Sequence, residues 1–429
     1  MNKINFSLQG LPVIWLEDKQ CYIIYSPFIR KFAVINNQEA FTNQKKIVRI
    51  LMEKGFWSTP QIEKERKINV VFTVTKQCNL NCIYCFANAS FLRKEKLSPS
   101  DAISVLAAIA NKQTIQTIHF IGGEPTLNFE TIKTIVEYAE RTCHLPIKFF
   151  ITTNGVIPEK KLAWLVQKGF IFTVSWDGIM HDISRSTKEG IPTFQKVCKT
   201  IKFLVNKNAH FRVRMTVTSL NLSTLPQSLK WCIENGVSFF HPEPMRPDGR
   251  AKNFQTLVVR PDKFCAMFRK ITKMAEDKGI WIINSALANL FSPKDHFCSS
   301  VHGKTLHINP DGSISRCYQV QSKNEFLSKY FLAGDWKKEN DCTLKIRKFF
   351  PKKLKFYSKC NQCFLQSICL SGCYYRHLSS LTKFDKWMCD IRKKIICFSI
   401  EHLYRRYSKG KISCLEGTYR FYSNYIIRS

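Results

Sequence analysis

The feature that most constrains this chain is a short run with three closely spaced cysteines, Cys78, Cys82 and Cys85. The run directly follows residues 68–75, an apolar and β-branched stretch that predicts a strand. A loop of this length can turn three thiolates toward one point. A structural zinc site is closed by four protein ligands, and this run offers only three. A four-iron cluster held by three cysteines keeps one iron open for a ligand that is not protein. The spacing indicates a metal centre with an open position; a zinc knuckle and unligated thiols are the alternatives.

The same stretch resembles the signature of the radical S-adenosylmethionine (SAM) family, in which an aromatic residue, here Tyr84, stands before the last cysteine. In that family the three cysteines hold a 4Fe–4S cluster, and its open iron chelates the methionine end of SAM. The resemblance implies that Cys78, Cys82 and Cys85 bind such a cluster. It also implies that one electron from the cluster cleaves SAM to a 5′-deoxyadenosyl radical.

The chain has 429 residues, enough for two or three domains around a sizeable core. Its first residues lack the apolar stretch of a signal peptide, and no uninterrupted apolar segment is long enough to span a bilayer. We therefore expect no membrane contact and a cytoplasmic location, where thiols are kept reduced. In that compartment the 18 cysteines point to metal ligands rather than to disulfides.

The formal net charge of +34 could attract nucleic acid, an anionic membrane or an acidic peptide. The positive residues are spread along the chain, and Lys, Asn and Ile are all abundant, as in AT-rich coding sequence. We interpret the charge as compositional drift with a mild preference for an acidic partner, and we do not expect a nucleic-acid surface.

The opening region, residues 1–66, has a small α+β pattern. It contains predicted strands at 21–25 and 32–35 and a predicted helix at 44–54, with Ile47, Ile50 and Leu51 on one side. The region resembles the leader-peptide recognition domains of peptide-modifying enzymes. An extension that packs on the catalytic domain is the alternative.

From about residue 68 to 243, predicted strands alternate with amphipathic helices. The strands are 69–75, 116–121, 147–152, 170–175, 211–217 and 237–241, and the helices lie near 99–111, 129–141, 158–168, 193–206 and 223–235. Six β-α units predict an α/β fold with a parallel sheet, either a partial barrel or a doubly wound sheet. In both, chemistry belongs at the C-terminal strand ends, where the cysteine loop lies. The resemblance implies a partial (β/α)6 TIM-like barrel over residues 67–280.

Glycine and polar residues follow the second strand. Gly122 and Gly123 let backbone approach a ligand closely, and they precede Glu124 and Pro125. The four residues resemble the family's GGEP motif, whose backbone contacts the SAM amino group; an ordinary glycine turn is the alternative.

Further polar residues follow the third and fourth strands at positions that match the family's SAM pocket: Thr153, Asn154, Ser175 and Asp177. The resemblance implies that Ser175 and Asp177 approach the ribose or the carboxylate of SAM. Residues 181–185 resemble the family's HDxxR segment, whose arginine, here Arg185, can pair with that carboxylate as a fork. Turns of the Asn-Gly and Asp-Gly type, and a surface position for Arg185, are the alternatives.

Residues 242–250 contain three prolines, which argue against a helix or a central strand. We expect a rigid polar loop at the end of the sixth strand. It would face the active site or link to a helix around 261–278.

A second set of cysteines occupies the C-terminal part: Cys298, Cys317, Cys360, Cys363, Cys369, Cys373 and Cys389. Residues 309–312, Asn-Pro-Asp-Gly, predict a hairpin between 306–308 and 313–315 that would bring Cys298 and Cys317 near each other. The spacings resemble the SPASM extension of radical SAM enzymes. The resemblance implies a C-terminal iron–sulfur domain over 281–395, followed by a basic tail, 396–429, in which 391–407 is predicted to be helical.

The SPASM resemblance implies two auxiliary 4Fe–4S clusters, with two zinc sites as the alternative. Cys298, Cys317 and Cys373 would hold the nearer cluster, and Cys360, Cys363, Cys369 and Cys389 the farther one. Some relatives supply a fourth ligand to the nearer cluster from a position that is Lys304 here. That cluster could therefore be open, use His302 or His307, or bind a substrate thiolate.

Together the motifs predict a radical SAM/SPASM oxidoreductase that modifies a peptide or protein, with a reductant such as flavodoxin or ferredoxin. The expected substrate is a ribosomal precursor peptide that receives a thioether or carbon–carbon cross-link. Anaerobic sulfatase maturation, which makes formylglycine, is the alternative; its enzymes carry an aspartate at the position of Tyr318, a poor base. A rival from another class is a zinc-dependent nucleic-acid-binding protein.

Overall fold

The computed structural model describes residues 5–36, 42–58, 67–142, 146–291, 297–298, 303–337, 360–380 and 385–410. The chain divides into two compact units. The sheet unit comprises Arg66–Asn284 and Ser300–Phe350, and the terminal unit comprises Met1–Glu65, Ser285–Ser299 and Pro351–Ser429. The predicted domain boundaries after residues 66, 280 and 395 stay predictions. Within the described ranges, no helix is both long and apolar enough to cross a bilayer.

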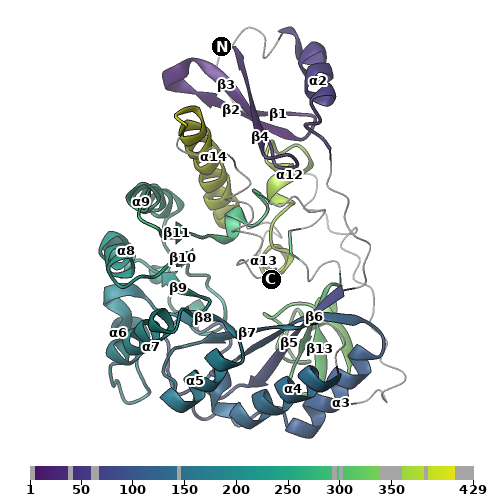
Figure 1. Cartoon of the computed structure of the whole chain (residues 1–429), viewed down its shortest axis with the longest axis vertical. Helices are drawn as coiled ribbons and strands as arrows, with labels where there is room; N and C mark the ends of the chain where they lie inside the picture. The colour runs from purple at the N-terminus through teal and green to yellow at the C-terminus, as the bar shows by residue number, and fades with distance from the viewer. Residues whose placement is uncertain are drawn as a thin grey trace. The chain divides into compact units, whose positions relative to one another are not determined.

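The sheet unit is built on one sheet, which has ten strands within the described residues (Figure 1). The strand order is β11-β10-β9-β8-β7-β6-β5-β12-β13-β14. Six neighbouring strands are parallel and match the six predicted ones: β5 (Lys67–Thr75), β6 (Thr114–Gly122), β7 (Lys148–Thr153), β8 (Ile171–Ser175), β9 (Phe211–Val217) and β10 (Phe239–Pro244). The predicted α/β fold is confirmed, and a mostly parallel sheet of this kind is consistent with a partial TIM-like barrel.

The predicted helices connect the parallel strands. They are α3 (Pro99–Ala110), α4 (Phe129–Thr142), α5 (Glu159–Gln167), α7 (Phe194–Asn206), α8 (Leu225–Glu234) and α9 (Pro261–Met274). Two short helices that the sequence did not predict are α6 (His181–Ser184) and α10 (Ser328–Phe331), which precedes β14. Ser98 caps α3, because its hydroxyl accepts a hydrogen bond from the Asp101 N–H, and Pro99 fits the first turn. Figure 1 shows α3, α4 and α5 along one side of the sheet.

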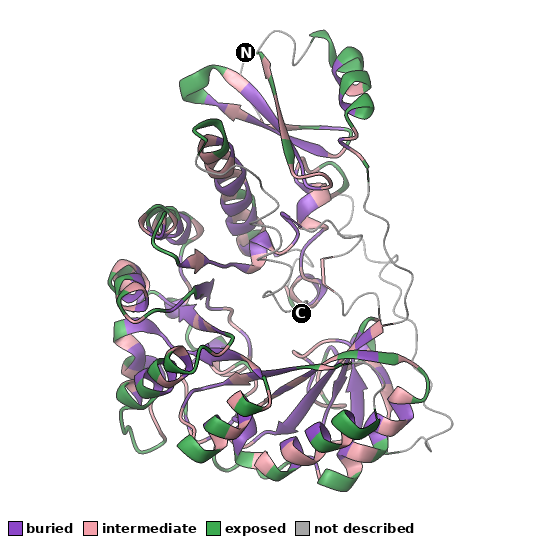
Figure 2. Ribbon diagram, viewed as in Figure 1, coloured by how far each residue is buried: buried purple, intermediate pink, exposed green. Residues whose placement is uncertain are grey.

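The side of the sheet that faces the helices is apolar. Phe120 and Phe172 are fully buried there, and Phe170 connects them to Trp164 of α5 through ring contacts. Figure 2 shows the central strands as buried and the outer surfaces of the helices as exposed. Burial of these aromatic rings contributes to the stability of this unit, together with aliphatic side chains such as Val70 and Ile118.

The opposite side of the sheet carries polar side chains, because successive residues of a strand point to opposite faces. Two hydrogen bonds confirm the register: Thr117 Oγ1 donates to Asn69 Oδ1 at 2.8 Å, and Arg212 Nε donates to Thr173 Oγ1 at 2.9 Å. We call this side the polar face, and the strand register places on it Asn69, Thr117, His119, Thr152, Thr173, Arg212, Arg214, Thr216, His241, Glu243 and His307.

The interpretation of residues 242–250 as loop throughout is wrong, since β10 extends through Pro244. The amide of Met245 donates to Val217 of β9, whereas the carbonyl of Phe240 accepts from Ile283 on the other side. By alternation, Pro242 and Pro244 turn toward that second side, where β11 (Trp281–Ile282) pairs only with Phe239 and Phe240. Because β11 does not pair with Pro242 or Pro244, their lack of an amide hydrogen removes no hydrogen bond between the strands.

The predicted hairpin is confirmed as β12 (Thr305–Ile308) and β13 (Ser313–Ser315), followed by β14 (Leu332–Asp335), which the sequence did not predict. The turn closes through a hydrogen bond from the Gly312 N–H to the Asn309 carbonyl, and Gly312 has a φ of 95°. β12 pairs in parallel with β5, so the hairpin extends the sheet from the strand that leads into the cysteine loop.

The terminal unit contains an antiparallel sheet of β1 (Phe6–Leu8), β2 (Leu11–Leu16), β3 (Cys21–Ser26) and β4 (Lys31–Asn36), with helix α2 (Gln44–Glu53). The first two strands were not predicted. Ile47 and Leu51 of α2 are buried in the core with Tyr22, whereas Ile50, predicted on the same side of the helix, is 38% exposed. The unit also contains α12 (Gln366–Cys369), α13 (Tyr374–Ser379) and α14 (Lys386–Ser408), which includes the predicted helix 391–407.

Candidate active site

The cysteine loop leaves β5 at the C-terminal end of the strand, as the sequence predicts. Its backbone is fixed by segments far along the chain: the Asn81 N–H donates to the Ser186 carbonyl at 2.9 Å, and the Ile83 N–H donates to the Ser184 carbonyl at 3.1 Å. Because these partners follow β8, the loop takes its shape only when the barrel strands have assembled.

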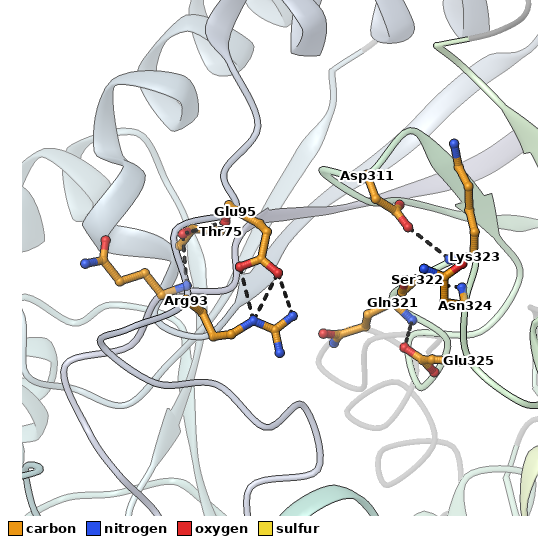
Figure 3. A network of polar contacts seen from close by, with 10 residues as sticks. Thr75, Arg93, Glu95, Asp311, Gln321, Ser322, Lys323, Asn324 and Glu325 are labelled. Carbon is orange, nitrogen blue, oxygen red and sulfur yellow. Dashed lines mark hydrogen bonds and ion pairs between the residues drawn. The ribbon is translucent and has the colours of Figure 1, made fainter.

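The far end of the loop returns to the same strand. Thr75 Oγ1 donates to the carbonyl of Glu95 at 3.2 Å, and Arg93 Nη2 pairs with Glu95 Oε1 at 2.7 Å. Figure 3 shows this group beside a second one, in which Asp311 of the hairpin turn accepts from the Lys323 N–H at 2.9 Å. Residues 75–95 thus form a loop whose two ends are joined by a hydrogen bond at the end of β5.

The surroundings of Cys78 and Cys82 raise the pKa of both thiols. Burial, and then the nearby Cys82 thiol, raise the pKa of Cys78 to about 12. Desolvation raises the pKa of Cys82 to about 11, partly offset by Arg185. Donors already approach the sulfurs: Asn154 Nδ2 lies 3.7 Å from Cys78 Sγ, and Arg185 Nη1 lies 3.8 Å from Cys82 Sγ. Metal coordination would supply the positive charge that favours loss of the protons of Cys78 and Cys82.

An all-cysteine donor set of this kind fits an iron–sulfur cluster. No three Cys, His, Asp or Glu side chains among the described residues converge as the ligands of a single ion would. A cluster does not require such convergence, because each thiolate binds a different iron. The ligand assignment to Cys78, Cys82 and Cys85 therefore stays a prediction that the chemistry of the donors supports.

The two glycines of the GGEP motif bring the end of β6 against the start of the cysteine loop. The Gly123 N–H donates to the Thr75 carbonyl at 2.8 Å, and the Glu124 N–H donates to the Gln77 carbonyl at 2.9 Å. A Cβ on Gly122 would lie 2.2 Å from the Thr75 oxygen, and one on Gly123 would lie 2.2 Å from the Gln77 oxygen. The close approach that we predicted toward a ligand is thus made, at least in part, toward the chain's own backbone.

The Glu124 side chain is fully buried and joins the ends of two strands. Its carboxylate accepts from Thr126 Oγ1 at 2.7 Å, from Thr153 Oγ1 at 2.9 Å and from the Asn154 N–H at 2.8 Å. Burial raises its pKa, and these hydrogen bonds oppose the shift. Glu124 therefore positions Asn154, whose Nδ2 also donates to Asn79 Oδ1 at 2.7 Å in the cysteine loop. Pro125 is buried at the start of the turn that follows.

Tyr84, Asp177 and Arg185 form a buried cluster. The Tyr84 hydroxyl donates to Asp177 Oδ2, and Arg185 Nε pairs with Asp177 Oδ1 at 3.1 Å. The Arg185 guanidinium also lies 5.2 Å from the centre of the Tyr84 ring. The alternative of a surface position for Arg185 is wrong, since only 7% of the residue is exposed. Its predicted partner, the SAM carboxylate, would have to share the guanidinium with Asp177.

The His-Asp pair that precedes Arg185 has an architectural role. His181 Nδ1 accepts from the Asp177 N–H at 3.1 Å, and its Nε2 lies 3.2 Å from Thr193 Oγ1. Asp182 Oδ1 accepts from the N–H groups of Thr193 and Phe194 and so caps α7. Ser175, at the end of β8, is 8% exposed and pairs in register with Arg214.

Sequence reasoning missed Arg250 as a site residue. Its Nη1 donates to the Cys82 carbonyl at 2.7 Å and its Nη2 to the Ala89 carbonyl at 2.8 Å, while its own N–H donates to the Cys85 carbonyl. A Cβ on Gly249 would lie 2.2 Å from the Phe86 oxygen, so this segment also touches the cysteine loop closely. The available signal was the predicted position of 242–250 at a strand end facing the site.

The second cysteine set is divided between the units. Cys360, Cys363, Cys369, Cys373, Cys389 and Cys298 belong to the terminal unit, and Cys317 belongs to the sheet unit. Within the terminal unit, the charges of Cys363 and Cys360 contribute to the raised pKa of Cys369, after burial as the main cause. Burial raises the pKa of Cys389 to about 11, and Cys369 and Cys363 add to the shift. Each of the four cysteines predicted for the farther cluster therefore lies within electrostatic range of at least two of the others. His302 lies outside the described residues, and Lys304 precedes β12.

The comparisons with known proteins agree with the motifs. A profile of the radical SAM superfamily matches residues 72–232. The chain is 31% identical over 253 residues to the uncharacterized protein MJ0907 of Methanocaldococcus jannaschii, which covers 58% of this chain and 84% of that protein. It is 23% identical to the radical SAM cyclopropyl synthase TigE of Paramaledivibacter caminithermalis over 86% of this chain and 85% of that protein.

Solved structures share the fold. The anSMEcpe structure with bound AdoMet and the Kp18Cys peptide has a TM-score of 0.65 at 19% identity, covering 79% of this chain and 98% of that one. Streptococcus suis SuiB bound to the precursor peptide SuiA has a TM-score of 0.56 at 16% identity, covering 89% and 99%. This chain belongs to the radical SAM superfamily and is an enzyme of that superfamily, whose members use a 4Fe–4S cluster and SAM.

Proposed function

We propose that this enzyme is a radical SAM/SPASM maturase that modifies a peptide. The observation that carries the proposal is the cysteine loop itself. Three thiols lie at the C-terminal strand ends, and the loop is fixed by the GGEP turn, by the segment before Arg185 and by Arg250. In this proposal Cys78, Cys82 and Cys85 hold the cluster that, when bound, supplies one electron to cleave SAM to a 5′-deoxyadenosyl radical.

The chain's own residues would orient SAM. We propose that the backbone of residues 122–125 contacts its amino group and that Ser175, Asp177 and Arg185 approach its ribose or carboxylate. Asn154 and Arg185 are well placed for this, because each already reaches a thiol of the cysteine loop. Thr153 and Glu124 act as positioning residues through their hydrogen bond. Tyr84 holds Asp177, and so keeps the buried Arg185 in place.

We propose two auxiliary 4Fe–4S clusters in the SPASM arrangement, on the cysteine sets named above. The electrostatic coupling of Cys369 and Cys389 to Cys363 supports the farther set. Such clusters supply an acceptor for the surplus electron or a site for a substrate thiolate. Lys304 at the position of a fourth ligand favours the second role for the nearer cluster.

The proposed substrate is a ribosomal precursor peptide that receives a thioether or carbon–carbon cross-link, with flavodoxin or ferredoxin as reductant. Support comes from SuiB, whose structure holds a precursor peptide, and from anSMEcpe, whose structure holds the Kp18Cys peptide. Sulfatase maturation is the second candidate, because anSMEcpe shares the fold. Tyr318 at the position of the aspartate base weighs against it.

The test has two stages. Anaerobically purified enzyme should contain about twelve irons per chain, by the arithmetic of three clusters, and should release 5′-deoxyadenosine from SAM and dithionite. Coexpression with a short peptide encoded beside the gene should then give a loss of about 2 Da per cross-link, since two hydrogens leave in the radical reaction. Zinc without iron, together with salt-dependent nucleic-acid binding, would overturn the enzyme assignment. Formylglycine on a coexpressed sulfatase would instead select the second candidate.

A further inference from the structure

Exposed apolar side chains gather on the part of the cysteine loop that follows Cys85. Phe86 is 39% exposed, Phe91 is 59% exposed and Leu92 is 68% exposed. Single exposed apolar residues are common on protein surfaces, but several close together mark an interaction surface. We call residues 91–94 the loop tip.

The fold does not need the side chains of the loop tip, because backbone groups hold it in place. The Arg93 N–H donates to the Ser90 carbonyl at 3.3 Å. The Phe91 carbonyl accepts from Gln77 Nε2 at 3.4 Å. These contacts remain when a side chain of the tip is replaced. The exposure of Phe91 and Leu92 therefore has a reason other than the stability of the loop.

Positive charge accompanies these apolar side chains. Lys94 Nζ lies 5.8 Å from the centre of the Phe91 ring, and both Lys94 and Lys96 are exposed. Within the described part of the chain neither lysine forms an ion pair, whereas the charge of Arg93 is balanced by Glu95. The loop tip thus combines apolar surface with a net positive charge.

A second segment, residues 318–330, has the same combination of groups. Phe326 is 75% exposed, and Lys329 Nζ lies 5.6 Å from the centre of its ring. The same ammonium lies 5.2 Å from the centre of the ring of Tyr330, which is 40% exposed. An exposed aromatic ring with a lysine across it therefore occurs in both segments.

Two interactions join the second segment to the cysteine loop. The Tyr318 ring lies 5.6 Å from the Phe86 ring. The carboxylate of Glu95 is the main cause of the raised pKa of Arg93, and the charge of Glu325 adds to that shift (Figure 3). The two segments therefore belong to one surface of the sheet unit.

The chemistry of this surface favours one kind of partner. An apolar surface with a net positive charge complements an acidic protein that itself exposes apolar groups. Flavodoxin and ferredoxin, the reductants of the proposed function, are small acidic proteins that must bring an electron close to the cysteine loop. The half-buried Cys85, a proposed cluster ligand, directly precedes the exposed Phe86, so this surface begins beside the site that needs the electron.

We propose that the loop tip, together with Phe326, is the docking surface for an acidic one-electron carrier protein. One electron leaves the reduced carrier, which is oxidised by one, and enters the cluster proposed on the cysteine loop, which is reduced by one. The inference rests on the proposed function, since it needs that cluster and a protein reductant.

A peptide substrate fits this surface less well. Its reacting residue must reach SAM, beside the buried side chains of Asp177 and Arg185, whereas a folded carrier can touch only exposed groups. A small patch also suits a carrier, because electron-transfer complexes are weak and bury little surface.

Binding measurements test the surface without turnover, with the holoenzyme and the oxidised flavodoxin and ferredoxin encoded in the same genome as probes. Phe91→Ser combined with Leu92→Ser should raise Kd about tenfold, because it removes apolar anchors. Lys94→Glu combined with Lys96→Glu should raise Kd about tenfold at low salt, and less at high salt because exposed charges are screened.

The matched control is Met52→Ser combined with Lys45→Glu, at exposed positions of α2. It makes the same kinds of substitution in the terminal unit and should leave Kd unchanged. Melting temperature and iron content should equal those of the wild type in every variant, since the altered side chains are exposed. A wild-type Kd in both loop variants would overturn the inference.

Release of 5′-deoxyadenosine separates docking from chemistry. With dithionite, a small ion that needs no docking surface, every variant should match the wild-type rate. With the reduced carrier, the variant Phe91→Ser, Leu92→Ser should need about tenfold more carrier for half-maximal release. Loss of dithionite-driven release at wild-type iron content would contradict the inference, because the tip would then serve the SAM site. A raised KM for the peptide, with unchanged dependence on the carrier, would assign the tip to the substrate instead.

The wild type distinguishes this inference from the proposed function. If it releases 5′-deoxyadenosine with dithionite but with neither carrier, the docking surface alone is refuted. If it releases none with dithionite, the proposed function fails, and the docking surface fails with it.

Discussion

The cysteine loop after β5 and the cysteine-rich segment 360–373 differ in what holds them. The first is fixed by residues far along the chain, as in the hydrogen bonds from Arg250 to the carbonyls of Cys82 and Ala89. The second is built mostly from local turns, in which the N–H of Cys363 donates to the Cys360 carbonyl and that of Gly372 to the Cys369 carbonyl. One long-range hydrogen bond adds to them, from Asn289 Nδ2 to the Ile368 carbonyl at 3.1 Å.

From this difference we infer that the shape of the cysteine loop depends on the fold, whereas the shape of segment 360–373 depends more on bound metal. Hydrogen bonds to distant segments of the sheet unit hold the cysteine loop in its shape, so we expect the loop to depend on the fold more than on its cluster. Short local turns contribute little free energy, so we expect metal binding to add much of the stability of this segment. Substitutions in the two sites should therefore have different effects on SAM cleavage, iron content and stability.

The largest expected effect is that of Cys82→Ala. One of three proposed protein ligands is lost, so release of 5′-deoxyadenosine should be abolished and the iron content should fall by about four per chain. Melting of the sheet unit should change little, because backbone contacts hold the loop. Cys265→Ala, in α9, is the matched control and should retain activity. Cleavage of SAM by Cys82→Ala would remove this cysteine from the ligand set.

Gly123→Ala comes next, since its Cβ would lie 2.2 Å from the carbonyl oxygen of Gln77. The clash should displace the cysteine loop and lower the free energy of unfolding by about 1–3 kcal/mol, with a large loss of SAM cleavage. At Gly169 an added Cβ would meet nothing within 4 Å, although its φ is 68°. Gly169→Ala should therefore cost about 1 kcal/mol and spare activity. Equal losses in the two variants would refute the steric argument.

Arg250→Ala should have an intermediate effect. It removes two hydrogen bonds to loop carbonyls and should lower the free energy of unfolding by about 2 kcal/mol, with reduced but measurable SAM cleavage. Arg250→Lys, which lacks the planar fork, should recover only part of this loss. Denaturant titration and a 5′-deoxyadenosine assay measure the two effects, and full recovery by lysine would show that charge alone suffices.

The smallest expected effect on SAM cleavage is that of Cys363→Ala. It should lower the iron content by about four per chain and stop peptide modification, yet leave peptide-independent release of 5′-deoxyadenosine close to the wild-type rate. If SAM cleavage fell as completely as in Cys82→Ala, the division of labour between the two cysteine sets would be wrong.

The sequence by itself determined the alternation of strands and helices and the position of the cysteine loop at a strand end. These features follow from local signals, namely hydrophobic period, proline and glycine positions and cysteine spacing, which act over a few residues. The hairpin at Asn309 was predictable for the same reason. The predicted roles of the cysteines rest on the same spacings.

Only the tertiary structure decided which residues hold the loop. Arg250 reaches the Cys82 carbonyl across 168 positions of sequence, and Glu124 joins Thr153 across 29. Pro242 lies inside a strand because β11 pairs only with Phe239 and Phe240 of β10 and so needs no amide hydrogen from Pro242. Likewise, His307 lies beside Val71 only because β12 pairs with β5. No local pattern records such pairings, because they are set by how distant strands pack side by side.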